Sequence, residues 1–261
     1  MDLKLHGRTA LVLGGGGGLG RATATSLARE GVRVAIADVN VDALDASQDE
    51  IAAIGGAAIG IVWDLADLDS IDAHVDTVEA DLGPVDILVN ITGGPPPTAV
   101  SGQEVQLWET GFRSMVLPVI KITDRVLPGM RARRWGRVIT SASSGVISPI
   151  RNLGLSNSLR SSLVGWSKTL ANEVARDGVT SNVVVPGRIG TQRIRFLDES
   201  KASSEGRLID DVVAESVASI PAGRYGEPTE YADAITFLAS ARAAYITGAT
   251  LRVDGGYISS I

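Results

Sequence analysis

The chain has 261 residues, of which 44% are hydrophobic and 21% charged, so it buries a substantial core and is not a disordered or low-complexity protein. Thirty acidic residues against 24 basic ones give a net charge of −6. This balance argues against a nucleic-acid-binding surface, because neutralising phosphates needs clustered positive charge. The absence of cysteine excludes disulfides and thiolate metal sites, and two distant histidines, His6 and His74, predict no metal centre.

No apolar run approaches the roughly 18 residues of a membrane span. The first residues, 1–7, also lack the apolar stretch of a secretory signal. We therefore expect a cytoplasmic protein without membrane partners.

Short apolar runs alternate with segments of helical periodicity along the chain. The runs predict buried strands over residues 9–13, 33–38, 58–63, 86–90, 137–140, 182–185 and 249–253. Helices are predicted over 21–30, 41–54, 70–81 and 155–176, and over a segment that ends before Pro128. Continuous apolar strands that alternate with helices are typical of a parallel sheet covered on both faces. We therefore expect an α/β fold, a Rossmann-type doubly wound parallel sheet, as a single domain over residues 1–261.

Glycines fill the connection between the first predicted strand and the first predicted helix. Gly14-x-x-x-Gly18-x-Gly20, with Leu19 inside it, permits a tight turn and a close backbone approach to a pyrophosphate at a helix N-terminus. Asp38 ends the next strand about twenty residues later, where an acid accepts hydrogen bonds from the adenosine ribose and repels a 2′-phosphate. The pattern predicts a dinucleotide site that favours NAD over NADP. The alternatives are a flexible loop and an ordinary strand-end acid.

The ordered motifs resemble the short-chain dehydrogenase/reductase family over nearly the whole chain. Asp64-Leu65 stands where that family contacts the adenine, and residues 90–93 stand where it usually has Asn-Asn-Ala-Gly. Residues 186–191 resemble its nicotinamide-side loop, and residues 223–228 and 247–256 are also similar to it. The resemblance implies cofactor contacts from Gly14, Gly18, Leu19, Gly20, Asp38, Asp64, Leu65, Asn90, Gly93, Arg160, Pro186, Gly187, Ile189 and Thr191.

The family's catalytic pattern of Ser, Tyr-x-x-x-Lys and a relay Asn is incomplete in this chain. Ser143 takes the serine register, but the Tyr and Lys positions fall on Ser156 and Arg160, and the Asn position falls on Met115. The downstream motif at residues 186–187 keeps the family spacing, which argues against a slipped alignment. Ser143, Ser156 and Arg160 are therefore the catalytic candidates.

These replacements change the chemistry that the site supports. A tyrosine with a pKa of about 10 is tuned toward neutrality by a neighbouring ammonium, whereas a serine hydroxyl is a far weaker acid. Arg160 stays protonated, so it suits the binding of ribose hydroxyls better than proton transfer. The favoured interpretation is an NAD(H)-dependent oxidoreductase acting on an alcohol or carbonyl of a small molecule, with a non-standard active site. The alternatives are a catalytically silent or regulatory NAD-binding protein and a non-redox enzyme that reuses the pocket.

Two further features follow from the resemblance. It implies a mobile substrate lid around residues 188–215, where the three arginines form either a solvated loop face or a contact to an anionic substrate group: Arg188, Arg193 and Arg195. It also implies a homo-oligomer, a tetramer or dimer. A stripe at helical spacing predicts core or a helix–helix interface: Leu159, Leu163, Trp166, Leu170 and Val174.

Overall fold

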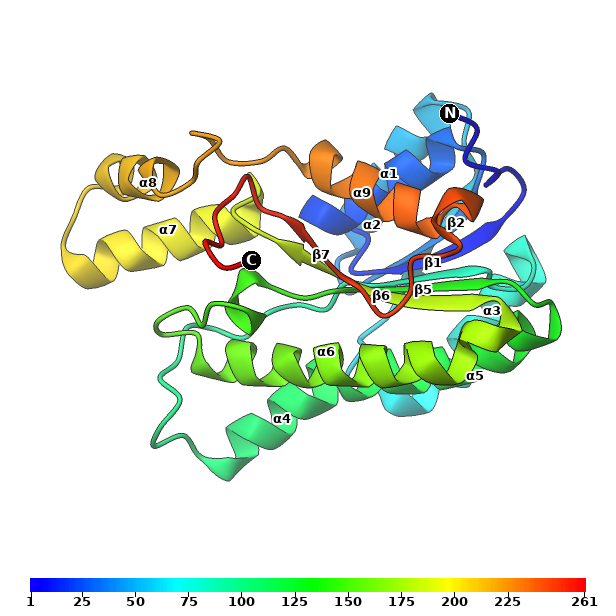
Figure 1. Ribbon diagram of the computed structural model, residues 1–261, viewed down its shortest axis with the longest axis horizontal. Helices are drawn as coiled ribbons and strands as arrows, with labels where there is room; N and C mark the ends of the chain where they lie inside the picture. The colour runs from blue at the N-terminus through cyan, green and yellow to red at the C-terminus, as the bar shows by residue number, and fades with distance from the viewer.

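The computed structural model describes residues 1–261 and contains one seven-stranded parallel sheet between two layers of helices (Figure 1). The strands are β1 (Thr9–Leu13), β2 (Arg33–Asp38), β3 (Ala58–Val62), β4 (Ile87–Asn90), β5 (Gly136–Ser141), β6 (Val179–Pro186) and β7 (Thr250–Val253). Their order is β3-β2-β1-β4-β5-β6-β7, so the chain reverses its direction of travel across the sheet between β3 and β4. The predicted doubly wound α/β fold is confirmed.

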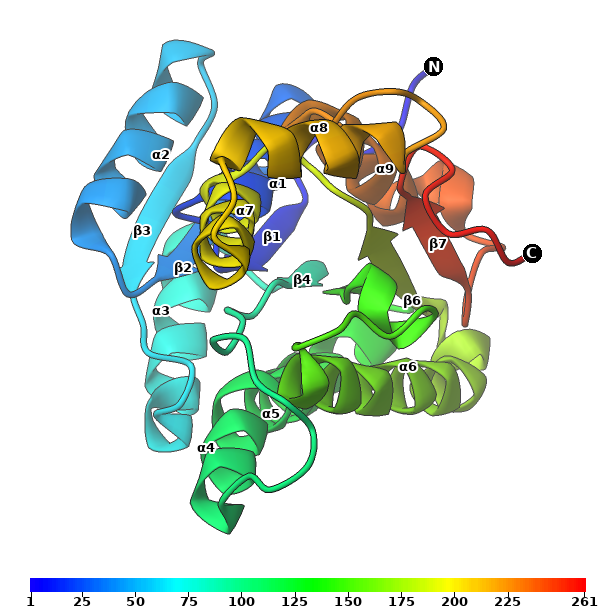
Figure 2. The same ribbon diagram turned by 90° about the vertical axis from the view of Figure 1, so that its left-hand side faces the viewer.

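Helices cover both faces of the sheet. One layer holds α1 (Gly18–Arg29), α2 (Val41–Ala53) and α9 (Pro228–Ala239), and the other holds α3 (Ile71–Leu82), α4 (Val105–Met115), α5 (Leu117–Ala132) and α6 (Gly154–Val174). Two further helices, α7 (Gln192–Glu205) and α8 (Ile209–Ala218), extend past the carboxyl ends of the strands (Figures 1 and 2). None of the helices combines the length and the apolar character needed to span a bilayer.

The core consists of two apolar layers, one on each face of the sheet. In β1, Ala10 and Val12 belong to the cluster with α1 and α9, whereas Leu11 and Leu13 belong to the cluster with α3, α5 and α6. All four are fully buried. Because successive side chains of a strand point to opposite faces, a strand covered on both faces is apolar throughout. This is why the sequence shows the inner strands as uninterrupted apolar runs.

All seven predicted strands are present, and β6 is longer than predicted. It begins at Val179 rather than at residue 182. The additional residues include Thr180 and Ser181, which are polar but buried, so the apolar pattern does not reveal them. The Ser181 hydroxyl lies 2.8 Å from the Ser167 hydroxyl of α6 and forms a hydrogen bond with it. Two hydroxyls that hydrogen-bond to each other can be buried in a strand. Polar residues nevertheless interrupt the apolar run from which the strand was predicted.

The prediction that a helix ends before Pro128 is wrong. Pro128 lies inside α5, which continues to Ala132. A proline in a helix removes one hydrogen bond and crowds the carbonyl four residues earlier. Here both Pro128 and that residue, Asp124, are on the exposed side of α5, where water reaches the free carbonyl. The buried residues on the opposite side, including Met130, keep the last turn packed against the sheet.

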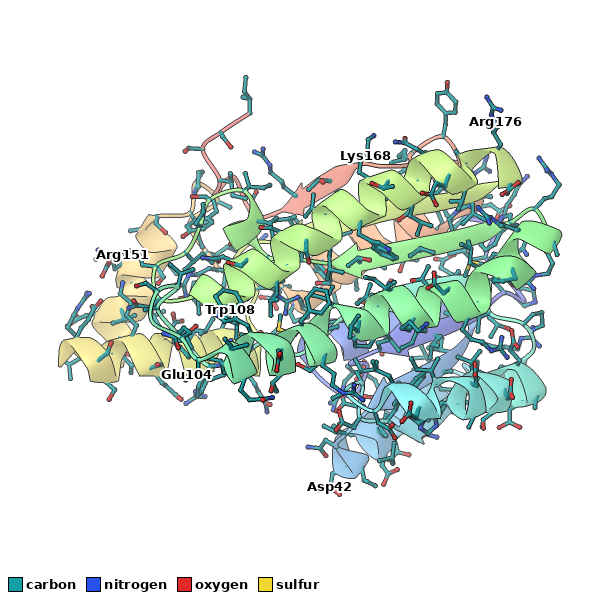
Figure 3. The ribbon with its side chains drawn as sticks, turned by 90° about the horizontal axis from the view of Figure 1, so that it is seen from below. Asp42, Glu104, Trp108, Arg151, Lys168 and Arg176 are labelled. Carbon is teal, nitrogen blue, oxygen red and sulfur yellow. The ribbon has the colours of Figure 1, made fainter.

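The apolar stripe of α6 is core within the chain. Leu159, Leu163, Leu170 and Val174 are buried, and only Trp166 keeps partial exposure. The exposed apolar surface in this layer instead lies on α4, which runs beside α6 (Figure 3) and carries Trp108 and Phe112. Phe112 is 40% exposed. If helices of this layer form an interface, α4 supplies its apolar surface.

Candidate active site

The connection from β1 to α1 is a closely packed glycine turn. Gly14 and Gly18 have φ angles of 64° and 46°, which belong to the left-handed region that favours glycine. A Cβ at Gly20 would collide with the carbonyl oxygen of Gly14 and lie 2.8 Å from the Cα of Gly15. Since α1 begins at Gly18, the turn presents backbone N–H groups and the positive end of the helix dipole to the open carboxyl edge of the sheet. This is a cradle for a phosphate group.

Asp38 lies at the rim of this cradle. Its carboxylate accepts hydrogen bonds from the backbone N–H of Gly16 (3.1 Å) and of Asn40 (3.1 Å). On the far side of the same turn, Arg21 donates to the carbonyl oxygen of Gly16 (2.9 Å) and to the hydroxyl of Ser47 (3.1 Å). The glycine turn is thus held between a carboxylate and a guanidinium, and the carboxylate faces the open edge.

The other predicted cofactor residues gather around the same edge. Asn90 is fully buried at the end of β4 and donates to the hydroxyl of Thr140 (3.3 Å). Gly93 is exposed in the following loop, and Leu65 packs against the core beside the exposed Asp64, whose carboxylate accepts from the N–H of Ala66 (2.9 Å). The ends of β1, β2, β3 and β4 therefore contribute to one edge, as the parallel alignment requires.

The loop after β6 reaches the glycine turn from the opposite side. Pro186 ends β6, Gly187 donates to the carbonyl of Val253 (2.9 Å), and Ile189 is buried. Thr191 caps α7, and a Cβ at Gly18 would lie 3.2 Å from its methyl group. The structure therefore brings Thr191 against the glycine turn, although Gly18 and Thr191 are 173 positions apart in the chain.

A nicotinamide dinucleotide fits these groups. The turn closes tightly only because Gly20 has no side chain, since a Cβ there would collide with the backbone of Gly14 and Gly15. Beside it, two buried oxygens, Asn90 Oδ1 and Thr92 Oγ1, have no hydrogen-bond partner within the protein. Buried polar atoms in folded proteins are rarely left unpaired, so these two point to a bound polar group.

The three catalytic candidates meet at the ends of β5 and α6. The hydroxyl of Ser143 accepts a hydrogen bond from the N–H of Gly145 (3.2 Å) and remains partly exposed after β5. Ser156 and Arg160 lie one turn apart in α6 and are 7% and 8% exposed. Met115 is buried in an apolar cluster with Leu155 and Leu159, so its position contributes packing and no polar group.

Arg160 is held by backbone carbonyls. Its guanidinium donates to the carbonyl oxygens of Ser141 (3.3 Å), Thr92 (3.2 Å) and Gly93 (2.9 Å). The pKa of Arg160 is lowered to about 10, mainly by burial; Tyr231 opposes this shift and the charge of Arg193 adds to it. The group therefore stays protonated at neutral pH and acts as a fixed cation and hydrogen-bond donor.

The sequence interpretation missed Tyr231. This side chain of α9 is fully buried, and its hydroxyl donates to the hydroxyl of Ser141 (2.7 Å), directly beneath the carbonyl that Arg160 binds. Burial raises the pKa of Tyr231 above its ordinary value, so it remains a neutral phenol. The available signal was a tyrosine at helical spacing from apolar residues in segment 228–239, for which no helix was predicted, because a buried hydroxyl needs a partner.

Arg188 forms an ion pair with an acidic residue of α7. Its guanidinium lies 2.5 Å from the carboxylate of Asp198, which is 2% exposed and also accepts from the hydroxyl of Tyr225 (2.8 Å). These three side chains connect the loop after β6, α7 and the segment before α9. Neither Asp198 nor Tyr225 was singled out from the sequence.

The sequence profile of the family described as enoyl-(acyl carrier protein) reductase matches residues 15–258. The chain belongs to the short-chain dehydrogenase/reductase family. It is 36% identical to the 3-oxoacyl-(acyl-carrier-protein) reductase of Vibrio harveyi over 97% of this chain and 98% of that protein. The corresponding reductase of Escherichia coli K12 is equally similar, at 36% identity over the same shares.

Solved structures of the family superpose along the full chain. L-sorbose reductase from Gluconobacter frateurii, in a complex with NADPH and L-sorbose, covers 100% of both chains with a TM-score of 0.93 and 28% identity. NAD+-bound xylitol dehydrogenase covers 97% of this chain and 100% of its own, with a TM-score of 0.90 and 25% identity.

Replacing Gly20 by alanine is expected to weaken the binding of a nicotinamide dinucleotide by about tenfold or more. The added methyl group collides with the Gly14 carbonyl, and relieving such overpacking costs about 1–3 kcal/mol. Titration of NAD+ followed by intrinsic fluorescence measures the change. Gly165→Ala in α6 is the matched control, since a Cβ there meets nothing within 4 Å and the residue lies outside the glycine turn. Equal loss in both variants would contradict the account of the turn.

Proposed function

We propose that this chain is an NAD(H)-dependent oxidoreductase that acts on an alcohol or carbonyl group of a small molecule through a non-standard active site. The proposal rests on one observation: two sets of polar groups lie at the same edge of the sheet. The first is the glycine cradle with the unpaired oxygens of Asn90 and Thr92. The second is Ser143, Ser156 and Arg160, at the ends of the adjoining elements.

The preference for NAD over NADP rests on Asp38 in this proposal. The relatives do not decide the matter, because the L-sorbose reductase structure holds NADPH and the xylitol dehydrogenase structure holds NAD+. The Asp38 carboxylate at the rim of the glycine turn repels a 2′-phosphate and accepts hydrogen bonds from free ribose hydroxyls.

The bound nicotinamide supplies or accepts a hydride at its C4 atom. Arg160 supports that group by offering its remaining N–H donors to ribose hydroxyls, and its charge does not change during the reaction. Ser143 and Ser156 orient the substrate oxygen by hydrogen bonds. Because neither hydroxyl has a pKa near neutrality, the proton reaches or leaves that oxygen through water, and turnover of ordinary ketones is slow.

The absence of a phenol at position 156 favours a second candidate, a silent or regulatory NAD-binding protein or a non-redox enzyme that reuses the pocket. The hydroxyls of Tyr225 and Tyr231 are engaged by Asp198 and Ser141, and Tyr245 is fully exposed. None of these three offers a free phenol to the substrate, and the fourth tyrosine, Tyr257, is half-buried against the apolar cluster that contains Ala142. NAD binding without redox turnover on any alcohol or ketone would favour this candidate.

The proposed lid covers residues 188–215 and comprises α7 and most of α8. These helices extend beyond the sheet (Figure 2) and are joined to each other by ion pairs of Glu215 with Lys201 (3.1 Å) and Arg207 (2.5 Å). The base of the lid is held by Arg188 and Asp198. This arrangement supports movement of the pair as one unit over the carboxyl edge.

NAD(H) is expected to bind more tightly than NADP(H), by about 1–3 kcal/mol as charge repulsion and lost hydrogen bonds combine. Asp38→Ala should reduce this difference in binding free energy between the two cofactors. Asp42→Ala, which removes an exposed carboxylate in the first turn of α2, should leave this difference unchanged. Fluorescence titrations of both cofactors with the three proteins measure the difference. Equal affinities in the unaltered protein would refute the role of Asp38.

The double substitution Ser156→Tyr with Arg160→Lys is expected to raise carbonyl reduction about tenfold or more, because it restores a phenol beside an ammonium. Ser143→Ala in that background should abolish the gain. Steady-state rates on one aromatic ketone and one 3-oxoester compare the proteins. Rapid turnover by the unaltered protein that survives Ser143→Ala would place the proton donor elsewhere.

We also propose a homo-oligomer, a dimer or tetramer, with α4 at an interface. Sedimentation velocity at micromolar concentration should show the oligomer, and Phe112→Asp should shift it toward smaller species, because a charge then replaces an apolar contact. Leu208→Asp, at a more exposed apolar residue between α7 and α8, should not change it. A monomeric unaltered protein would exclude the proposal.

A further inference from the structure

The three arginines that follow β6 have different partners. Arg188 is paired with the buried Asp198, and Arg195 pairs with Glu199 one turn away on the exposed side of α7 (3.0 Å). Arg193 has no carboxylate within ion-pair distance, although it is only half-exposed. Its single protein hydrogen bond goes to the carbonyl oxygen of Pro95 (2.8 Å), in the loop after β4.

Arg160 is the second cation of this region without a carboxylate partner. It is buried, and only carbonyl oxygens accept its hydrogen bonds. Burying a cation away from water costs free energy, which backbone carbonyls repay only in part because they carry partial charges. The chain as a whole has a net charge of −6, so acidic residues are in excess. The lack of an acidic partner for these two guanidinium groups is therefore specific to this region.

The two guanidinium groups bind the same short loop. Arg160 donates to the carbonyl of Gly93, and Arg193 donates to the carbonyl of Pro95. Between them, a Cβ at Gly94 would lie 3.0 Å from Nη2 of Arg193, so this cation packs directly over the glycine. Their proximity also follows from the effect of Arg193 on the pKa of Arg160. Two like charges so close together repel each other unless an anion lies between them.

Donors remain for such an anion. Arg193 uses one of its five N–H groups on Pro95, and its guanidinium carbon lies 5.4 Å from the centre of the Phe196 ring, which fixes the plane of the group. The buried hydroxyl of Thr92 has no partner and belongs to the same loop. A planar guanidinium with free N–H groups is suited to a carboxylate, which it binds by two parallel hydrogen bonds.

We propose that Arg193, beside the buried positive charge of Arg160, binds a carboxylate of the substrate, so that the substrates are small hydroxy acids or oxo acids. This inference rests on the proposed oxidoreductase function and specifies its substrate class. Arg160 lies one helical turn from Ser156 and shares the loop after β4 with Arg193, so the carboxylate site adjoins the end of the pocket that holds Ser156. The cofactor's pyrophosphate is the other anion in reach, because Thr191 contacts the glycine turn two residues before Arg193, and the test below distinguishes the two anions.

The test is the binding of malonate, a small dicarboxylate, to the full chain, with the neutral malonamide as its matched probe. Isothermal titration is run with and without saturating NAD+. We expect malonate to bind and malonamide to show no measurable binding. Arg193→Gln should weaken malonate binding by about tenfold or more, because it removes charged hydrogen bonds. Arg195→Gln, on the same helix and paired with Glu199, should leave the affinity unchanged.

Three outcomes would overturn the inference. One is no malonate binding to a protein that binds NAD+, and another is equal malonate affinity in the unaltered protein and Arg193→Gln. The third is a loss of NAD+ affinity in Arg193→Gln with unchanged malonate binding, which would assign the arginine to the cofactor's phosphates. A failure of the proposed function has a different signature, the absence of NAD+ and NADP+ binding whatever malonate does.

Discussion

The buried guanidinium of Arg160 connects the parts of this molecule on which its functional edge depends. It reaches from α6 between the ends of two parallel strands, where it binds the carbonyls of Thr92 and Gly93 after β4 and of Ser141 in β5. Because parallel strands end at one edge, a single side chain can join two strand ends and a helix. The Tyr231 hydroxyl supports the same place from the opposite layer through Ser141. The position of Ser156, one turn earlier in α6, is set by this connection.

A site organised around a permanently charged arginine differs in its chemistry from one organised around a titrating pair. Its pKa of about 10 keeps Arg160 protonated at neutral pH, so it binds and orients but does not exchange protons. The serines at 143 and 156 are hydrogen-bonding groups with the same limitation. Such a site stabilises anions and hydroxyls that are already present. The slow proton transfer and the carboxylate-bearing substrates that we propose therefore have the same physical origin, a site that binds charge but does not exchange protons.

The segment after β6 shows how similar side chains acquire different tasks from their surroundings. Arg188 is neutralised by the buried Asp198 and ties the loop after β6 to α7, and Arg195 forms an exposed ion pair that contributes little to stability. Arg193, between them in sequence, faces the loop after β4 and has no acid beside it. The functional difference lies in which carboxylates the fold brings near, and not in the arginines themselves.

The sequence alone determined the fold class, the strands and the glycine turn, because these depend on local patterns: apolar runs, glycine spacing and an acid at a strand end. It did not determine that α5 continues past Pro128, since that depends on which side of the helix meets water. It singled out Ser143, Ser156 and Arg160, but the carbonyl partners of Arg160 and the role of Tyr231 came only from the tertiary structure. Those contacts join residues 19 to 90 positions apart, and no local pattern encodes such distances. The separation of Arg193 from its two neighbours is of the same kind, because the packing of α7 against the loop after β4 decides which cation lacks an acid.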